Sequence, residues 1–141
     1  MKILIGLILF SIFLFLSGLH FFWGVGGKWG ANGAVPSKET GQTVLNPKPI
    51  DCFAVGIGLF CFAILVLVKS TILNINLPLW LLNKGLLLIC AIFILRAIGE
   101  FRYVGFFKKV RATNFGRLDT KYFSPLCLII GILSFIMFLL K

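Results

Sequence analysis

Charged residues are scarce in this sequence, and acidic residues are almost absent from it. Only 13% of the 141 residues are charged, and Asp and Glu together number four. A soluble domain carries about 25% charged and about 45–50% apolar residues, whereas 60% of this chain is hydrophobic. So few polar residues cannot cover the surface of a soluble domain, which excludes an ordinary cytosolic enzyme or a secreted globule. The composition predicts an integral membrane protein.

Residues that bind metals or carry redox chemistry are also few. The chain has one histidine, His20, and no Cys-x-x-Cys pair among its four cysteines. A metal site needs several ligands, and a membrane thiol-disulfide oxidoreductase needs paired cysteines. No nucleophile-base pair, phosphate-binding loop or cofactor motif is present either. We therefore predict no metal and no cofactor, and we interpret the cysteines as small buried hydrophobic residues: Cys52, Cys61, Cys90 and Cys127.

Four apolar runs are long enough to cross a bilayer, which takes about 20 residues as a helix. They cover about residues 3–23, 52–68, 79–98 and 123–140. Backbone groups in lipid must be hydrogen-bonded within the chain, so helices are the expected form of these runs. The sequence predicts an all-α fold: a four-helix integral membrane bundle of up-down topology, forming a single transmembrane domain over residues 1–141.

The first run begins like a signal peptide, because Met1 and Lys2 precede apolar residues. The run is about 20 residues long, whereas the apolar core of a signal peptide has about 7–15. It is followed by His20-Phe21-Phe22-Trp23 rather than by small residues suited to cleavage. We expect it to remain as the first helix.

Two substantial loops connect these helices. Residues 24–50 hold six glycines and three prolines, which argue against a regular helix there. Residues 101–122 are basic, and Phe106-Phe107-Lys108-Lys109 is typical of a segment at the membrane interface. Its rings are expected in the headgroup layer and its ammonium groups in water. The interfacial basic residues of this prediction are Lys108, Lys109 and Arg111.

The formal charge of +10 is interpreted as a topology signal and not as a nucleic-acid-binding surface. Nine Lys and Arg fall in loops 24–50 and 101–122, whereas the opposite side has Lys2, Lys69, Lys84 and Lys141. Since basic loops stay in the cytoplasm, the count places both loops there and both termini outside. The pair Met1-Lys2 argues for the reverse orientation. The predicted location is a cell membrane, and the family resemblance given below implies that it is the inner membrane of a bacterium.

Polar residues within or beside the apolar runs gather at the end of the bundle that carries the two large loops. We predict a polar pocket at that end. Its candidate residues are His20, Trp23, Asp51, Arg96, Glu100, Arg102, Asp119 and Tyr122.

Arg96 is the most informative of these residues, because it follows an unbroken apolar run. An arginine in the membrane is costly and usually has a partner. Glu100 is four residues further on and would share a helix face with it, while Asp119 and Asp51 are alternative partners. The pattern fits either a pocket for an anionic or polar headgroup or a structural ion pair at a helix end.

The chain resembles a bacterial family of small four-span membrane proteins catalogued as a domain of unknown function. The resemblance rests on a His-x-x-Trp-x-x-Gly-Gly pattern and on later blocks: His20, Trp23, Gly26, Gly27, Pro36, Gly99-Glu100-Phe101-Arg102-Tyr103-Val104-Gly105, Phe115, Asp119 and Tyr122-Phe123-Ser124-Pro125-Leu126-Cys127. It implies the four-helix topology and no specific activity.

Two classes of function remain open from the sequence. The first is a small membrane protein that binds a lipid, such as one with an anionic headgroup, or a membrane protein partner through the polar pocket. The alternative is a membrane enzyme or carrier for a lipophilic substrate that uses His20, Glu100 and Asp119 as proton-handling groups. A channel is disfavoured because no polar stripe runs through the membrane.

Overall fold

The computed structural model describes residues 1–140, and this part of the chain is helical without strands. Four segments are long and apolar enough to cross a membrane, which confirms the predicted all-α, four-span fold. Lys141, one of the basic residues counted above, lies outside the described residues. The helices in chain order are α1 (Lys2–Gly24), α2 (Ala31–Ala34), α3 (Pro49–Lys69), α4 (Leu79–Ile98), α5 (Asn114–Leu118), η1 (Asp119–Phe123) and α6 (Ser124–Leu139).

The boundary of the fourth span differs from the prediction. The spanning helix begins at Asn114, about nine residues earlier than expected, because Thr113 caps it by accepting the Gly116 N–H at 3.0 Å. The turn from Asp119 to Phe123 is a π-helix, a wide turn that is common at functional sites. The basic loop is therefore shorter than predicted, and its last part belongs to the helix.

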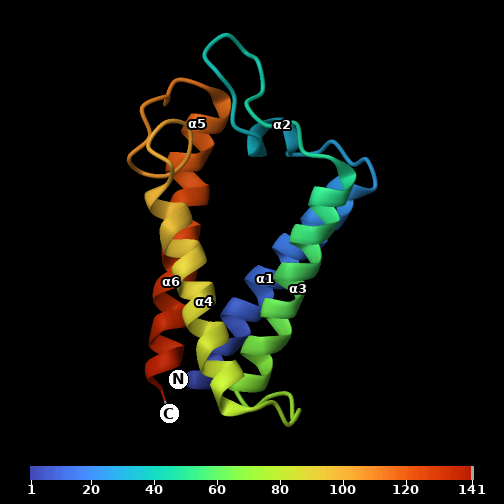
Figure 1. Ribbon diagram of the computed structural model, residues 1–141, viewed down its shortest axis with the longest axis vertical. Coiled ribbons are helices and arrows are strands. Elements are labelled where there is room, and N and C mark those ends of the chain that lie inside the picture. The colour runs from blue at the N-terminus through green and yellow to red at the C-terminus, as the bar shows by residue number, and fades with distance from the viewer. Residues whose placement is uncertain (141) are drawn as a thin grey trace.

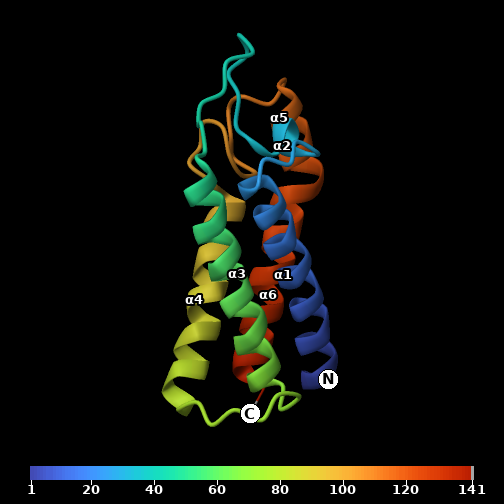
Figure 2. The same ribbon diagram turned by 90° about the vertical axis from the view of Figure 1, so that its right-hand side faces the viewer.

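The four spans pack as two antiparallel pairs, α1 with α3 and α4 with α6 (Figures 1 and 2). Small residues allow the close approach within each pair. In the first pair, Ser17 Oγ donates to the carbonyl oxygen of Gly56 at 2.7 Å. In the second pair, a Cβ atom at Gly131 would lie 2.6 Å from the Ile94 side chain.

The two pairs converge at the end that carries both termini and diverge toward the opposite end (Figure 1). The core fills the converging part. Phe13 of α1 is fully buried at its centre, with ring centroids 5.8 Å from Phe62 of α3 and 5.6 Å from Phe93 of α4. Packing between the spanning helices therefore joins the pairs from their middle to the converging end, and the arrangement leaves room between them at the other end.

The loop between α1 and α3 reaches over the diverging end. Its single-turn helix α2 is a departure from the expectation that glycines would exclude a helix here. Gly33 of α2 is buried against α5, and a Cβ atom there would lie 2.6 Å from Leu118 Cδ1. The glycine thus allows α2 to pack against α5, and the loop covers the gap between the two pairs.

The cysteines differ from the interpretation as buried residues. All four are free; Cys61 is exposed, while Cys52, Cys90 and Cys127 are half-buried. On a helix that faces lipid, an exposed thiol of low polarity carries little cost, so burial was not required.

Candidate functional site

Asp119 is the centre of a buried ionic cluster at the loop end of the molecule. Its side chain is fully buried. Oδ1 accepts a hydrogen bond from Arg96 Nη2 at 2.9 Å, and Oδ2 accepts from Lys108 Nζ at 2.9 Å. The Gly105 N–H and the Ser124 hydroxyl also donate to Oδ2, at 2.8 and 3.1 Å. The carboxylate is thus saturated with donors, which is the condition for burying a charge at tolerable cost.

Lys108 is the member of the cluster that the sequence analysis placed wrongly. Its side chain is fully buried, not in water at the interface. Besides Asp119, its ammonium group donates to the Gly105 carbonyl at 3.0 Å and to Thr120 Oγ1 at 2.6 Å. Three acceptors match the three donors of an ammonium group. The other two predicted interfacial basic residues, Lys109 and Arg111, are exposed.

Two glycines shape the loop that delivers Lys108 and the Gly105 N–H to Asp119. Gly99 and Gly105 have φ values of 85° and 89°, which L-residues with a side chain rarely adopt. The two glycines also pack against each other, and a Cβ atom at Gly105 would overlap the Ile98 carbonyl group. The Phe106 N–H donates to the Ala97 carbonyl at 2.8 Å, so the loop turns back on the end of α4.

Arg96 belongs both to the ionic cluster and to the wall of a cavity. Its pairing with Asp119 selects one of the partners predicted from sequence, and not Glu100. The side chain is 33% exposed, and its second terminal nitrogen, Nη1, is buried without a hydrogen-bond partner in residues 1–140. The cluster holds two cations and one anion, a net charge of +1. Its unused donor belongs to the residue that lines a cavity.

The cavity lies between the two helix pairs and has a volume of about 460 Å³, within the range of small-molecule sites. Its walls are mainly apolar side chains of α1, α3, α4 and α6, and Ala34 of α2 lies over it. Among the polar side chains on its surface are His20, Trp23 and Arg96. The cavity is therefore an apolar chamber with a few polar groups.

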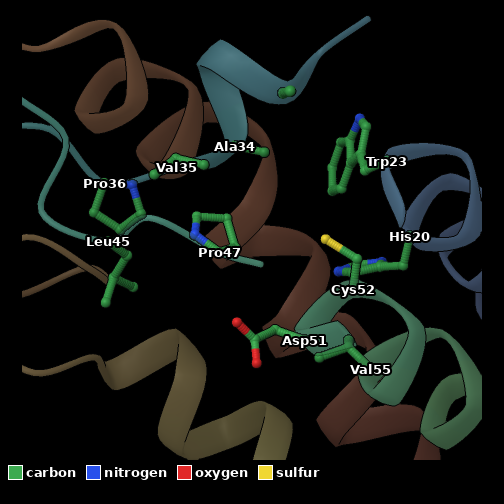
Figure 3. A pocket seen from close by; sticks show the side chains of 11 residues that line it. His20, Trp23, Ala34, Val35, Pro36, Leu45, Pro47, Asp51, Cys52 and Val55 are labelled. Carbon is green, nitrogen blue, oxygen red and sulfur yellow. The ribbon is translucent and has the colours of Figure 1, made fainter. Parts of the chain in front are cut away.

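A second hollow of about 230 Å³ adjoins the cavity and shares His20 and Trp23 with it (Figure 3). The loop prolines Pro36 and Pro47 and the first turn of α3 form its other walls. Asp51, a predicted pocket residue, lies here and is exposed. One of its oxygens is engaged, because Oδ2 accepts the Lys48 N–H at 2.8 Å and caps α3.

His20 and Trp23 are held in place by their own backbone contacts. His20 Nδ1 donates to the Leu16 carbonyl at 2.8 Å. Trp23 meets the imidazole edge to face, with ring centroids 5.1 Å apart, and donates from Nε1 to the Trp29 carbonyl at 2.8 Å. These contacts tie the end of α1 to the covering loop and fix both rings at the cavity wall.

Three of the predicted pocket residues lie away from the cavity. Glu100 is exposed and accepts the Tyr103 N–H, and it lines a separate open hollow together with Arg102. Tyr122 is 53% exposed, and Lys121 Nζ lies 5.1 Å from its ring centroid. The cavity therefore gathers His20, Trp23 and Arg96, with Asp119 directly behind the arginine.

Lys108 is the residue that the prediction missed as part of the site. Its neighbours in sequence, Phe107 and Lys109, are both exposed, and no periodic pattern separates Lys108 from them. The one available signal was the shortage of acidic residues, because with four carboxylates in the chain one of them can serve as counter-ion to more than one basic residue. That signal does not single out one lysine among the loop's six basic residues.

Together, the fold and the site define a small multi-pass helical membrane protein with an apolar cavity under a loop. Residues 13–134 match the family model described as "Protein of unknown function (DUF3995)", and the chain belongs to this family. The match includes all residues that line the cavity. No curated protein and no solved structure matches the chain. In the described part of the chain, no three His, Cys, Asp or Glu side chains are grouped so that they could hold a metal ion.

Proposed function

We propose that the protein binds an amphiphilic, lipid-like ligand with an acidic headgroup. The apolar part of the ligand occupies the cavity between the helix pairs, and its headgroup accepts a hydrogen bond from Arg96 Nη1. The observation that carries this proposal is that nitrogen atom, which is buried without a partner in the described residues and belongs to a side chain that lines the cavity.

The charge of the cluster supports an acidic headgroup. Asp119 compensates one of the two cations beside it, which leaves a net charge of +1. The excess positive charge lies beside the cavity that Arg96 lines, and an anion at Arg96 would neutralise it. The guanidinium group suits carboxylate or phosphate oxygens because its donors lie in one plane.

The chamber itself supports a lipid-like body. Its walls come from all four spanning helices, including Leu59 and Phe62 of α3 and Ile130 of α6. A ligand from the bilayer exchanges one apolar environment for another there. The polar contacts at Arg96 then determine affinity, as is usual for sites with few polar groups.

The geometry favours binding over the enzyme or carrier hypothesis. Of the three proton-handling groups of that hypothesis, His20 lines the cavity, whereas Glu100 is at the outer surface. Asp119 accepts four hydrogen bonds and two of them come from cations, so it is poorly suited to accept a proton. The hypothesis of a membrane protein partner has no comparable support, because no surface among the described residues favours a protein over lipid.

We also propose that the protein lies in a bacterial inner membrane with the cavity end in the cytoplasm. The loops with nine basic residues lie at that end, and the termini lie at the other (Figure 1). The excess of basic residues supports this orientation, and the resemblance described above supports a bacterial source.

The test of ligand binding uses Trp23 as a reporter, since it lines the cavity. The chain has three tryptophans, and the changes Trp29→Phe and Trp80→Phe leave Trp23 alone. We expect brominated stearate to quench its fluorescence saturably in a neutral detergent, with reversal by excess stearate. Arg96→Gln should weaken binding about ten- to a hundredfold, because a hydrogen bond to a charged group contributes about 1.5–3 kcal/mol.

The matched control is Arg117→Gln, which removes the same charge from an exposed arginine that donates to the Ala112 carbonyl. It should leave binding unchanged. Arg96→Gln retains the ion pair between Lys108 and Asp119, so the variant is expected to fold. Quenching that does not saturate, or equal affinity in the Arg96 variant, would overturn the proposal.

A further inference from the structure

The contact of His20 with its own helix indicates which ring nitrogen carries a hydrogen, because Nδ1 lies 2.8 Å from the Leu16 carbonyl oxygen. A carbonyl oxygen only accepts hydrogen bonds, so Nδ1 must carry the hydrogen. In the neutral imidazole, Nε2 is then a hydrogen-bond acceptor. The residue thus has one nitrogen engaged by its own helix and one acceptor nitrogen left for other contacts.

That acceptor is unmet by the protein itself. Across residues 1–140, the bond to Leu16 is the hydrogen bond that His20 makes. The ring lies at the junction of the two hollows and points toward the space between α3 and the covering loop (Figure 3). Nearby wall residues such as Ala34 and Val55 are apolar, and the Trp23 N–H is used by Trp29.

The cavity wall therefore holds two side chains whose unpaired nitrogens are complementary. Arg96 Nη1 is a donor without an acceptor, and His20 Nε2 is an acceptor without a donor. Both residues line the same cavity. An acidic headgroup alone satisfies the arginine and leaves the acceptor nitrogen of the half-buried histidine without a protein or ligand partner.

We infer that the preferred ligand carries a hydroxyl group beside its acidic group, so that the hydroxyl donates to His20 Nε2 while the acid accepts from Arg96. This inference rests on the proposed function and names the headgroup class: a hydroxy acid on a lipid chain. His20 acts here as a specificity-determining residue, and the covering loop holds it in position through Trp23.

The test is a competition on the protein with Trp23 as its single tryptophan. Brominated stearate is displaced in turn by stearate, 2-hydroxystearate and 3-hydroxystearate, which have the same chain length. At least one hydroxy acid should displace it about two- to tenfold better than stearate does, the range expected for one hydrogen bond between neutral groups. In the His20→Phe variant, which retains a ring against Trp23, this preference should disappear.

A control on the ligand removes any dependence on the folding of the variant. The methoxy analogue of the preferred acid keeps the oxygen atom but cannot donate, so it should bind no better than stearate in the unmodified protein. A methoxy acid as good as the hydroxy acid overturns the inference, as does equal displacement by all the acids or a preference that survives His20→Phe. In those cases acid binding itself would still stand, whereas absence of saturable quenching by brominated stearate would remove the proposed function.

Discussion

Arg96 serves two purposes through two atoms of one side chain. Nη2 donates to Asp119 at 2.9 Å, and Nη1 is buried without a partner among the described residues, in a side chain that lines the cavity. A lysine at this position would carry the same charge on one nitrogen, and it lacks the two separate terminal nitrogens of a planar guanidinium group. The planar guanidinium group thus links the structural ion cluster to the cavity.

The ion cluster predicts a large stability effect at Asp119. Asp119→Asn should lower the free energy of unfolding by about 3–5 kcal/mol, because it removes the counter-charge of a buried pair and leaves two cations facing each other. Thermal or denaturant unfolding of the purified protein in detergent measures the change.

Glu100→Gln is the control for this change, since it makes the same chemical substitution at an exposed carboxylate that lies outside the cluster. Surface substitutions usually change stability by within about 0.5 kcal/mol. Equal losses in the two variants would show that the buried cluster contributes no special stability.

Among the elements, the loop from Gly99 to Val110 organises the site more than any single helix does. It turns at two glycines of positive φ, sends the Gly105 N–H to Asp119 and places Lys108 in the interior. The π-helical turn η1 places Asp119 opposite them. The two glycine turns depend on backbone geometry that side chains would prevent.

Gly105→Ala is expected to disrupt this loop. The substitution forces a side chain into a left-handed conformation, at a cost of about 1–2 kcal/mol, and moves the N–H away from Asp119, at a further cost of about 1–3 kcal/mol. The unfolding free energy should fall by about 2–5 kcal/mol in the denaturation assay.

Gly18→Ala provides the comparison, because Gly18 lies within α1 and a Cβ atom there meets nothing within 4 Å. Alanine is favoured over glycine in a helix by about 1 kcal/mol, so this variant should be neutral or slightly more stable. If Gly105→Ala were equally well tolerated, the loop could not be the rigid element described above.

At the scale of the whole molecule, the two helix pairs and the covering loop form one chamber. The pairs meet through Phe13 at the middle of α1, and at the opposite end from the termini α2 reaches from one pair onto α5 of the other (Figure 1). All ionisable groups of the proposed site lie at the covered end. The orientation of the protein therefore decides from which side of the membrane the site is covered.

The proposed orientation predicts a labelling pattern in intact cells, in a variant without the four native cysteines. Thr40→Cys, in the exposed covering loop, should stay unlabelled by an impermeant thiol reagent until the cells are opened. Asn74→Cys, in the exposed turn at the other end, should react at once. The reverse pattern would place the cavity end outside.

The sequence by itself determined the four spans and the end of the bundle at which the polar residues gather. Hydropathy adds along a chain, and backbone groups in lipid leave only the helix for each apolar run. Alternation of the spans then brings the residues near His20, Arg96 and Asp119 to one end. The bounds of the spans α1, α3 and α4 accordingly agree with the prediction to within about three residues.

Only the tertiary structure decided which charges meet. The spacing of four residues paired Arg96 with Glu100 on a continuous helix, but α4 ends at Ile98 and Gly99 turns the chain away. The partner of Arg96 is instead Asp119, and Lys108, predicted at the interface, is buried and also pairs with Asp119. Ion pairing depends on distances in space, and the backbone geometry that sets these distances arises only when the loop packs against η1.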